Sequence, residues 1–178
     1  AGLTAAIYSA RAKLKPLVIS GRAEGGQLML TTVVENYPCF PEGIMGPDMI
    51  SRAKEQAKRF GARFVDGDLE KFAVKTGSSS NGRNIYELTV EGEKTEAESV
   101  IISTGASARM LGLESEKAYF NRGVHTCAVC DGYFYSGKDV AVIGGGDSAC
   151  EESLFLAKLV NSVTIIHRRS ELRASRIM

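Results

Sequence analysis

The chain has 178 residues, a formal net charge of +1 and 44% hydrophobic residues. This composition excludes a disordered tail, a collagen-like repeat and a coiled coil, and the near-neutral charge argues against a nucleic-acid partner. No apolar run reaches the roughly 18 residues needed to cross a bilayer, so we expect a soluble protein without a membrane partner. Glycine is enriched, at 19 residues, which indicates loops whose backbone approaches a ligand closely.

The first residues predict a helix and then a strand. Apolar residues recur at helical spacing from Leu3 to Leu14, and Pro16 ends the predicted helix. The apolar run at residues 17–19 is typical of a buried parallel strand. We therefore expect the chain to open with the helix and second strand of a βαβ unit whose first strand precedes Ala1.

Residues 20–47 predict a long loop, because periodicity is weak and Pro and Gly are frequent there. Loops of this length in a compact domain are usually functional. A helix is expected from Asp48 to Phe60, with Gly61 just past its end. The other expected elements are strands at 64–65, 72–74, 85–90 and 100–102, a flexible hairpin tip at 77–82 and a solvated turn at 91–96.

The second half predicts a complete βαβ unit. Its parts are a strand at 140–143, a glycine turn at 144–146, a helix at 147–160 and a strand at 163–166. Two units of this kind predict an α/β fold with two Rossmann-like, three-layer nucleotide-binding domains, both incomplete in this chain. The boundary is expected near Arg109 to Leu113, which gives domains at residues 1–109 and 110–178.

The glycine turn of the second unit fits a dinucleotide-binding fingerprint. Gly144, Gly146 and Ala149 match G-x-G-x-x-A between a strand and a helix. The first glycine makes the tight turn, the second lets the backbone approach a pyrophosphate, and the small alanine allows close helix packing. Asp147 and Ser148 open the helix, at whose N-terminus a pyrophosphate would bind. A plain glycine-rich turn is the alternative.

The end of the second strand indicates NADP rather than NAD. An NAD site usually has an acidic residue there, about 20 residues after the glycines, to bind the ribose hydroxyls. This strand instead leads into His167, Arg168 and Arg169, with Arg173 one turn later. Guanidinium groups form bidentate pairs with a phosphate such as the 2′-phosphate of NADP. A solvated basic edge is the alternative.

Cys127 and Cys130 form a C-x-x-C pair, for which three interpretations are open. A zinc site would need four ligands, and only His125 lies nearby; this histidine is better explained as a surface or hydrogen-bonded residue. Two buried structural cysteines are a second interpretation. A redox dithiol is favoured, because the pair adjoins a nucleotide-binding unit and Asp131 offers a carboxylate that can move protons on and off a thiol.

The four cysteines are too few for a disulfide-stapled secreted domain, and Cys39 and Cys150 are expected to be small apolar packing residues. A nicotinamide gives a hydride, whereas a disulfide accepts electrons through thiolate chemistry, so a flavin is the usual intermediary. A flavin site is therefore predicted in the first βαβ unit and the long loop.

A series of motifs, in this order, resembles the low-molecular-weight thioredoxin reductase family over essentially the whole chain. Residues 1–6 resemble the end of a G-x-G-x-A-G fingerprint. The other motifs are Gly25-Gly26-Gln27-Leu28, Glu35-Asn36-Tyr37-Pro38, Thr104-Gly105-Ala106, the C-x-x-C-D-G at 127–132, the Gly144 turn and His167-Arg168-Arg169. The resemblance implies an FAD domain interrupted by an inserted NADPH domain, motion of the two domains that brings the flavin to NADPH and thioredoxin in turn, and a homodimer.

The resemblance also implies the sites. FAD, in residues 1–109, would contact Gly2, Ser20, Gly21, Gly25, Gly26, Gln27, Leu28 and Asn36, with Thr104, Gly105 and Ala106 nearby. NADPH, in residues 110–178, would be held by Gly144, Gly146, Asp147, Ser148, Ala149, His167, Arg168, Arg169 and Arg173. Cys127 and Cys130 would form the active disulfide, with Cys130 nearer the flavin, Cys127 exchanging with thioredoxin and Asp131 donating the proton. No metal is expected.

The leading hypothesis is an enzyme, an NADPH-dependent flavoprotein that reduces the disulfide of thioredoxin. One alternative is a related flavoprotein that reduces a peroxidase partner or oxidises a small-molecule dithiol with the same cysteine pair. A second, from a different class, is a non-catalytic NADP-binding module. Cytoplasm is the expected compartment because reactive dithiols persist where thiols are kept reduced, and an organelle stays open because the N-terminal segment is missing.

Overall fold

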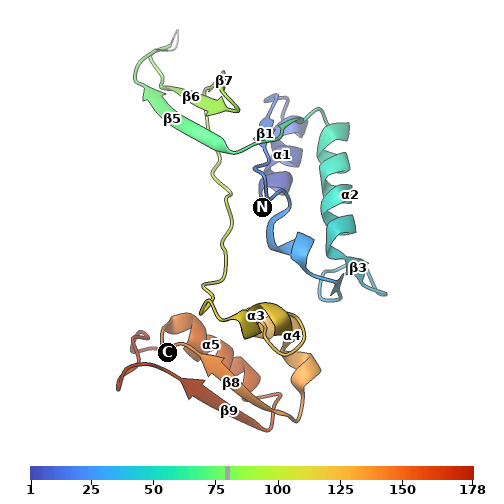
Figure 1. The fold of residues 1–178 in the computed structure, drawn as a ribbon. Coiled ribbons are helices and arrows are strands. Elements are labelled where there is room, and N and C mark those ends of the chain that lie inside the picture. Colours follow the sequence, from blue (N-terminus) through green and yellow to red (C-terminus); the bar gives the residue numbers. More distant parts are fainter. Residues whose placement is uncertain (79–80) are drawn as a thin grey trace. The chain divides into compact units, whose positions relative to one another are not determined.

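The computed structural model describes residues 1–78 and 81–178. The chain divides into two compact units, Ala1–Ser107 and Ala108–Met178 (Figure 1). The division lies within a few residues of the boundary expected near Arg109 to Leu113. In the part of the chain that the structure describes, no helix combines the length and the apolar content that a membrane span requires.

The first unit is built on a parallel strand pair and two helices. β1 (Leu17–Ile19) pairs in parallel with β4 (Arg63–Val65), and α2 (Gly46–Arg59) lies between them in the sequence. α1 (Gly2–Arg11) lies beside α2 (Figure 1). The buried cluster of this unit consists of alanines, which let α1 and α2 approach closely; they are Ala6, Ala10 and Ala57 of the helices and Ala62 before β4, with Ile7, Val18, Phe60 and Phe64 packed around them.

The end of α1 differs from the expected helix, which was to run on to Pro16. Lys13 takes the left-handed conformation with φ of 60°, and its N–H donates to the carbonyl of Ala10. The N–H of Leu14 donates to the carbonyl of Ser9, which completes a Schellman end without a glycine. Leu14, whose spacing suggested an internal position, lies beyond the end of α1 and is 71% exposed.

The segment expected to be a long loop contains short regular elements. Gly25 and Gly26, both at positive φ, open the 3-10 helix η1 (Gly26–Leu30), and β2 (Val33–Val34) pairs with β3 (Ile44–Met45) in an antiparallel ladder. The loop prediction is therefore wrong at these residues. α2 begins two residues before the expected Asp48, with Pro47 in its first turn.

β5 (Leu69–Lys75), β6 (Ile85–Val90) and β7 (Glu93–Ala97) form an antiparallel sheet in that order. The solvated turn expected at 91–96 is wrong for residues 93–96, which belong to β7. Only Glu91 and Gly92 form the turn, and both have the positive φ that a two-residue hairpin loop requires. The hairpin tip expected at 77–82 connects β5 to β6, and its residues 79–80 lie outside the described residues.

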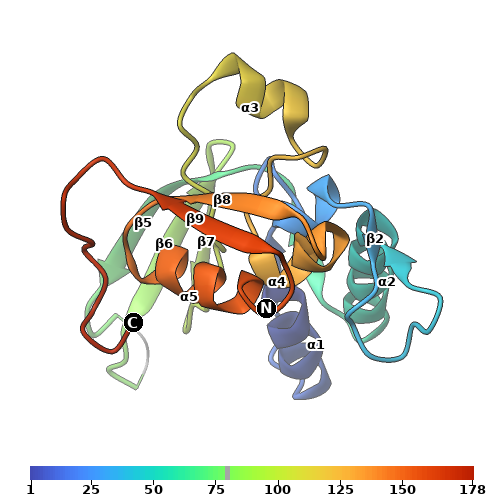
Figure 2. The same cartoon turned by 90° about the horizontal axis from the view of Figure 1, so that it is seen from below.

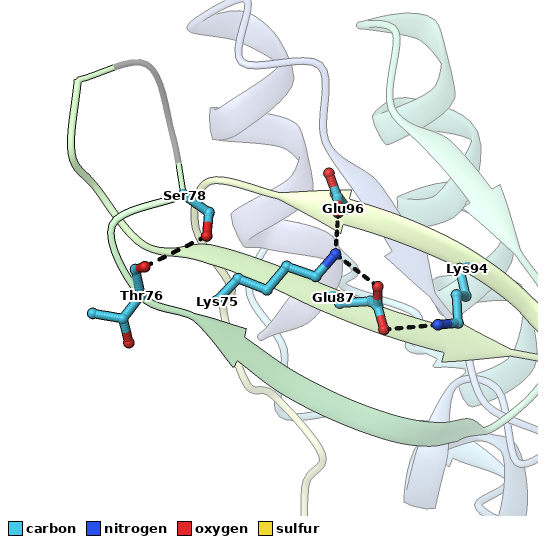
Figure 3. A network of polar contacts seen from close by, with 6 residues as sticks. All are labelled: Lys75, Thr76, Ser78, Glu87, Lys94 and Glu96. Carbon is cyan, nitrogen blue, oxygen red and sulfur yellow. Dashed lines mark hydrogen bonds and ion pairs between the residues drawn. The ribbon is translucent and has the colours of Figure 1, made fainter.

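One face of this sheet carries a network of charges (Figure 3). The Nζ atom of Lys75 lies 2.9 Å from Oε2 of Glu87 and 2.7 Å from Oε1 of Glu96, and Lys94 lies 3.1 Å from Oε1 of Glu87. The hydrogen bonds to Glu96 and then Glu87 raise the pKa of Lys75, and those from Lys75 and then Lys94 lower the pKa of Glu87. Strand alternation directs Phe72, Tyr86 and other apolar residues to the opposite face.

The prediction of a buried strand at residues 100–102 is wrong. Ile101 and Ile102 are 65% and 78% exposed, and no strand lies between Ala97 and Glu114, a segment that the structure describes throughout. An apolar run becomes a strand only where a neighbouring strand completes its backbone hydrogen bonds. Within the described residues β1 pairs with β4 alone, and no strand lies beside residues 100–102.

The second unit confirms the predicted βαβ unit. β8 (Asp139–Ile143) and β9 (Ser162–Ile166) pair in parallel, and α5 (Asp147–Leu156) lies along one face of this pair (Figure 2). The buried cluster of this unit comprises Val142, Ala149 and Leu156 together with Ala128, which precedes β8, with Val140, Phe155, Val160 and Val163 around it. α5 ends at Leu156, before the expected residue 160, and tighter turns follow, such as Leu159 N–H to the carbonyl of Leu156.

Three short helices precede β8: α3 (Glu114–Tyr119), α4 (Ala128–Asp131) and η2 (Gly132–Tyr135). The Glu116 carboxylate accepts hydrogen bonds from the backbone N–H groups of Leu111, Gly112 and Leu113 at 2.7–3.0 Å. These bonds, the one from Leu111 first, lower the pKa of Glu116. α3 is thereby capped by its own third residue, a pattern that stabilises a short helix at its N-terminus.

Candidate functional site

Cys127 and Cys130 are joined by a disulfide at the N-terminus of α4. Cys127 is the N-cap residue, and its Sγ atom accepts a hydrogen bond from the Cys130 N–H at 3.2 Å. Cys127 is half-buried and Cys130 is exposed, so the bond lies at the surface of the second unit. Within residues 1–78 and 81–178, no group of three or more His, Cys, Asp or Glu side chains is arranged to hold a metal ion.

Asp131, the last residue of α4, is held by His125. The imidazole Nδ1 lies 2.9 Å from Oδ2 of Asp131, and Nε2 lies 2.7 Å from the Tyr135 hydroxyl. The side chains of His125 and Asp131 are only 18% and 27% exposed. The hydrogen-bonded histidine expected from the sequence is confirmed. Neither of its two partners was predicted.

A carboxyl group from α5 also reaches α4. Glu152 accepts a hydrogen bond from the backbone N–H of Ala128, directly after Cys127. Burial raises the pKa of Glu152 above its usual value, this hydrogen bond opposes the rise, and the neighbouring Glu151 adds to it. Glu152 is one helical turn beyond Ser148 in the expected helix, a position that its sequence alone does not distinguish from a solvated one.

The glycine turn at residues 144–146 joins β8 to α5 and lies against the end of β9. A Cβ atom on Gly145 would lie 2.5–2.7 Å from atoms of the His167 ring, so only glycine fits beneath this imidazole. The segment after β9 returns to the turn, because Arg173 N–H donates to the carbonyl of Gly145 at 2.6 Å. The N–H of Ser175 donates to Oδ1 of Asp147 at 2.5 Å.

The structure therefore brings together most residues predicted to hold NADPH. Those around the turn are Gly144, Gly146, Asp147, Ser148, Ala149, His167 and Arg173. Arg168 and Arg169 follow His167 directly and are exposed. Nε2 of His167 is buried and has no hydrogen-bond partner within the described residues, which is unusual for a buried polar atom.

In the first unit, a pocket of about 430 Å³ lies at the carboxyl ends of the parallel strands β1 and β4. Its lining residues are Gly21, Arg22, Glu24, Asp66, Gly67 and Glu91. Ligands of open parallel sheets bind at this edge. Ser20, between β1 and Gly21, has a buried hydroxyl without a hydrogen-bond partner in the part of the chain described. Asp66 and Gly67 were not predicted, although their position directly after a strand is a signal that identifies them.

Other residues predicted to contact FAD lie in two places. Gln27 of η1 donates from Nε2 to the carbonyl of Ala106 at 2.5 Å, which joins the Gly25–Leu28 motif to the corner at Thr104, Gly105 and Ala106. Gly2 begins α1, where an added Cβ would lie 2.7 Å from the Ser103 hydroxyl. Asn36 is exposed between β2 and β3 and does not line the pocket.

The two other cysteines differ from each other. Cys150 on α5 is buried, as expected of a packing residue. Cys39 is exposed and adopts a positive φ of 77°, so the packing role expected for it is wrong. It lies in the connection between β2 and β3, at residues 35–43.

Residues 1–178 match the family described as pyridine nucleotide-disulphide oxidoreductase, and the chain belongs to this family. The thioredoxin reductase of Mycolicibacterium smegmatis is 49% identical over 178 residues, which are 100% of this chain and 55% of that protein. The glucosaminate ammonia-lyase of Pseudomonas fluorescens is 46% identical over 180 residues, 100% of this chain and 53% of that protein. The chain spans about half the length of these curated relatives.

A solved structure is also similar. The thioredoxin reductase from Giardia duodenalis superposes with a TM-score of 0.85 at 40% sequence identity, over 99% of this chain and 55% of that one. This likeness confirms the α/β fold predicted from the two βαβ patterns. Together with the relatives, it also confirms the resemblance to thioredoxin reductases on which the site residues were predicted.

Proposed function

We propose that this protein is a thioredoxin-disulfide reductase that draws electrons from NADPH through FAD. The observation that carries the proposal is the Cys127–Cys130 disulfide, which lies in the same compact unit as the glycine turn and the basic end of β9. A cysteine pair beside a nucleotide-binding βαβ unit is suited to redox chemistry. The relative and the solved structure named thioredoxin reductase support the same function.

Residues 1–109 are proposed to bind FAD. The carboxylates of Glu24 and Asp66 in the pocket can accept hydrogen bonds from ribose hydroxyls, and the unpartnered Ser20 hydroxyl can donate to a ligand at the same edge. The N-terminus of α1 at Gly2 has free N–H groups that favour a pyrophosphate. FAD, when bound, accepts a hydride from a nicotinamide and passes an electron pair to a disulfide.

Residues 110–178 are proposed to bind NADPH. The absence of a side chain at Gly144 and Gly146 leaves the backbone open to a pyrophosphate at the start of α5. Arg168, Arg169 and Arg173 supply guanidinium groups for the 2′-phosphate. The ring of His167, with one buried nitrogen free, lies beside the turn on the same edge.

Thiol exchange is proposed to follow reduction of the cysteine pair. Two electrons break the Cys127–Cys130 bond, and the Cys127 thiolate attacks the partner disulfide, which forms a mixed disulfide and releases a partner thiolate. Asp131 supplies the proton that this leaving thiolate takes. The Cys130 thiolate then attacks the Cys127 sulfur, which restores the intramolecular disulfide and releases the second partner sulfur as a thiolate that takes its proton from water.

A cytoplasmic homodimer is part of the same proposal. Reactive dithiols persist in compartments where glutathione and thioredoxin keep thiols reduced, which supports the cytoplasm. The homodimer is carried over from the family resemblance. Sedimentation of the full-length protein measures it directly: a species of twice the chain mass supports the dimer, and a monomer at all concentrations contradicts it.

The direct test is thioredoxin-dependent oxidation of NADPH by the full-length FAD-loaded protein. Wild type should turn over, Cys127→Ser should lose turnover while NADPH still reduces the flavin, and Cys39→Ser, which changes an exposed cysteine outside the pair, should match wild type. Turnover with a peroxidase partner or a small dithiol, and none with thioredoxin, would favour the related flavoprotein. Binding of NADP without any flavin would favour the non-catalytic module.

A further inference from the structure

We infer that His125 is a positioning residue for Asp131, the residue directly after Cys130: Tyr135, His125 and Asp131 form one hydrogen-bond chain that holds the carboxyl group in one orientation for proton transfer. The inference deepens the proposed function and rests on it for the role of Asp131. It is carried by the contacts of Nδ1 with Asp131 Oδ2 at 2.9 Å and of Nε2 with the Tyr135 hydroxyl at 2.7 Å.

The donors and acceptors in this chain have one consistent assignment when Asp131 is ionised. A carboxylate only accepts hydrogen bonds, so Nδ1 of His125 must carry a proton and donate it to Oδ2. In a neutral imidazole Nε2 then accepts, and the Tyr135 O–H donates to it. Each polar atom of the imidazole is satisfied, which fixes both the tautomer and the ring orientation.

When Asp131 is protonated, the same contacts remain satisfied with the same tautomer. The proton lies on Oδ1, which does not contact His125, while Oδ2 still accepts from Nδ1–H and Nε2 still accepts from the Tyr135 O–H. His125 therefore keeps the Asp131 carboxyl in one orientation both before and after it gives its proton away. A carboxyl group held in one place transfers a proton faster than one that samples several rotamers.

The three residues are drawn together by the local fold rather than by a distant contact. His125 precedes the N-cap Cys127 by two residues, Asp131 follows Cys130 as the last residue of α4, and Tyr135 ends η2. The rings of His125 and Tyr135 meet edge to face with their centroids 5.2 Å apart. This packing limits rotation of the imidazole, so the hydrogen bond to Asp131 is preorganised.

Charged groups on neighbouring elements also lie near α4 and η2. From α5, Glu152 accepts the hydrogen bond of the Ala128 N–H at the opposite end of α4. From the segment before β8, the Nζ atom of Lys138 lies 5.5 Å from the centre of the Tyr135 ring. Both side chains are present in all the variants proposed below, so a difference in rate between variants reports on the hydrogen bonds among Tyr135, His125 and Asp131.

The test uses the full-length FAD-loaded protein, reduced with dithionite, and follows exchange of its cysteine pair with a small aliphatic disulfide, whose leaving thiolate needs a proton, across a range of pH. His125→Ala should slow exchange on the order of tenfold and shift the pH profile, because general acid catalysis contributes about 10²–10⁴-fold in total. His125→Asn, whose amide N–H can replace Nδ1–H, should recover much of the rate. Tyr135→Phe should have a smaller effect in the same direction.

A double variant separates positioning from a structural role. If His125 acts through Asp131, His125→Ala should add almost nothing to the loss caused by Asp131→Asn. The inference would be overturned if the rate of the double variant fell by the product of the two single losses. A lower Tm for His125→Ala with an unchanged rate and pH profile would also overturn it. Absence of thioredoxin turnover in wild type would overturn the proposed function instead, since exchange with the small disulfide does not depend on that partner.

Discussion

The imidazole of His167 occupies the space that a side chain on residue 145 would need. A Cβ there would lie 2.5 Å from Nδ1, so Gly145→Ala must displace the ring or the turn. We expect a loss of about 1–3 kcal/mol of stability from this overlap, measured by denaturant unfolding. A stability equal to wild type would show that the end of β9 moves freely away from the turn.

Gly146→Ala is the matched variant, because a Cβ at residue 146 would meet no atom within 4 Å and φ there is −100°. Its stability should equal that of wild type. NADPH affinity should nonetheless fall on the order of tenfold, since the methyl group lies where the backbone approaches the pyrophosphate. Unchanged NADPH affinity would remove this turn from the proposed cofactor site.

The arginines after β9 should determine the preference for NADPH over NADH. Replacing Arg168 and Arg169 together by Gln removes two guanidinium groups that can pair with the 2′-phosphate. KM for NADPH should rise on the order of tenfold or more, while KM for NADH changes little. Arg122→Gln, an exposed arginine elsewhere in the second unit, is the control. An equal rise for both nucleotides would contradict a 2′-phosphate contact.

The charged face of the three-stranded sheet should make stability sensitive to acid. Hydrogen bonds from Lys75, and then Lys94, lower the pKa of Glu87, so the folded state favours the ionised form of this side chain more than the unfolded chain does. The resulting stability is present above the ordinary carboxyl range and is lost as pH falls through the lowered pKa. In Glu87→Gln this loss should be absent, as thermal unfolding at several pH values would show. Glu98→Gln, an exposed carboxylate after β7, should behave as wild type.

Glu152 should give stability the opposite dependence on pH. Burial raises its pKa, so ionisation costs the folded state more than the unfolded chain, and the penalty is present above the raised pKa and absent below the ordinary carboxyl range. Glu152→Gln keeps an oxygen that can accept from Ala128 N–H and removes the charge. Its Tm should equal or exceed that of wild type at neutral pH, and the difference should disappear in acid. A lower Tm at neutral pH would mean that the charged carboxylate stabilises α4.

Local periodicity was sufficient to predict β8, α5 and β9, because each carries its own apolar run or helical face around the glycine turn. It failed for β7, where three of the five residues are charged and only pairing with β6 makes a strand. It failed in the other direction at Ile101 and Ile102, which are apolar but have no neighbouring strand within the described residues. Strand formation depends on partners that the local sequence does not specify.

In the candidate site, too, contiguous motifs could be predicted from the sequence and contacts made on folding could not. The cysteines, the glycine turn and the arginines form contiguous motifs, and these could be predicted from their spacing. The partners of Asp131 could not, because His125 and Tyr135 reach it only after α4 and η2 have formed. Glu152 meets α4 through packing of α5, which is a tertiary contact.

The central claim is that Cys127 and Cys130 exchange electrons with a flavin reduced by NADPH. Anaerobic titration of the full-length FAD-loaded protein with NADPH, followed by the flavin absorbance, measures it most directly. Wild type should take up more reducing equivalents than its flavin alone can hold, and Cys127→Ser should take up only those of the flavin. Equal uptake by the two proteins would show that the disulfide is not connected to the flavin and would contradict the account.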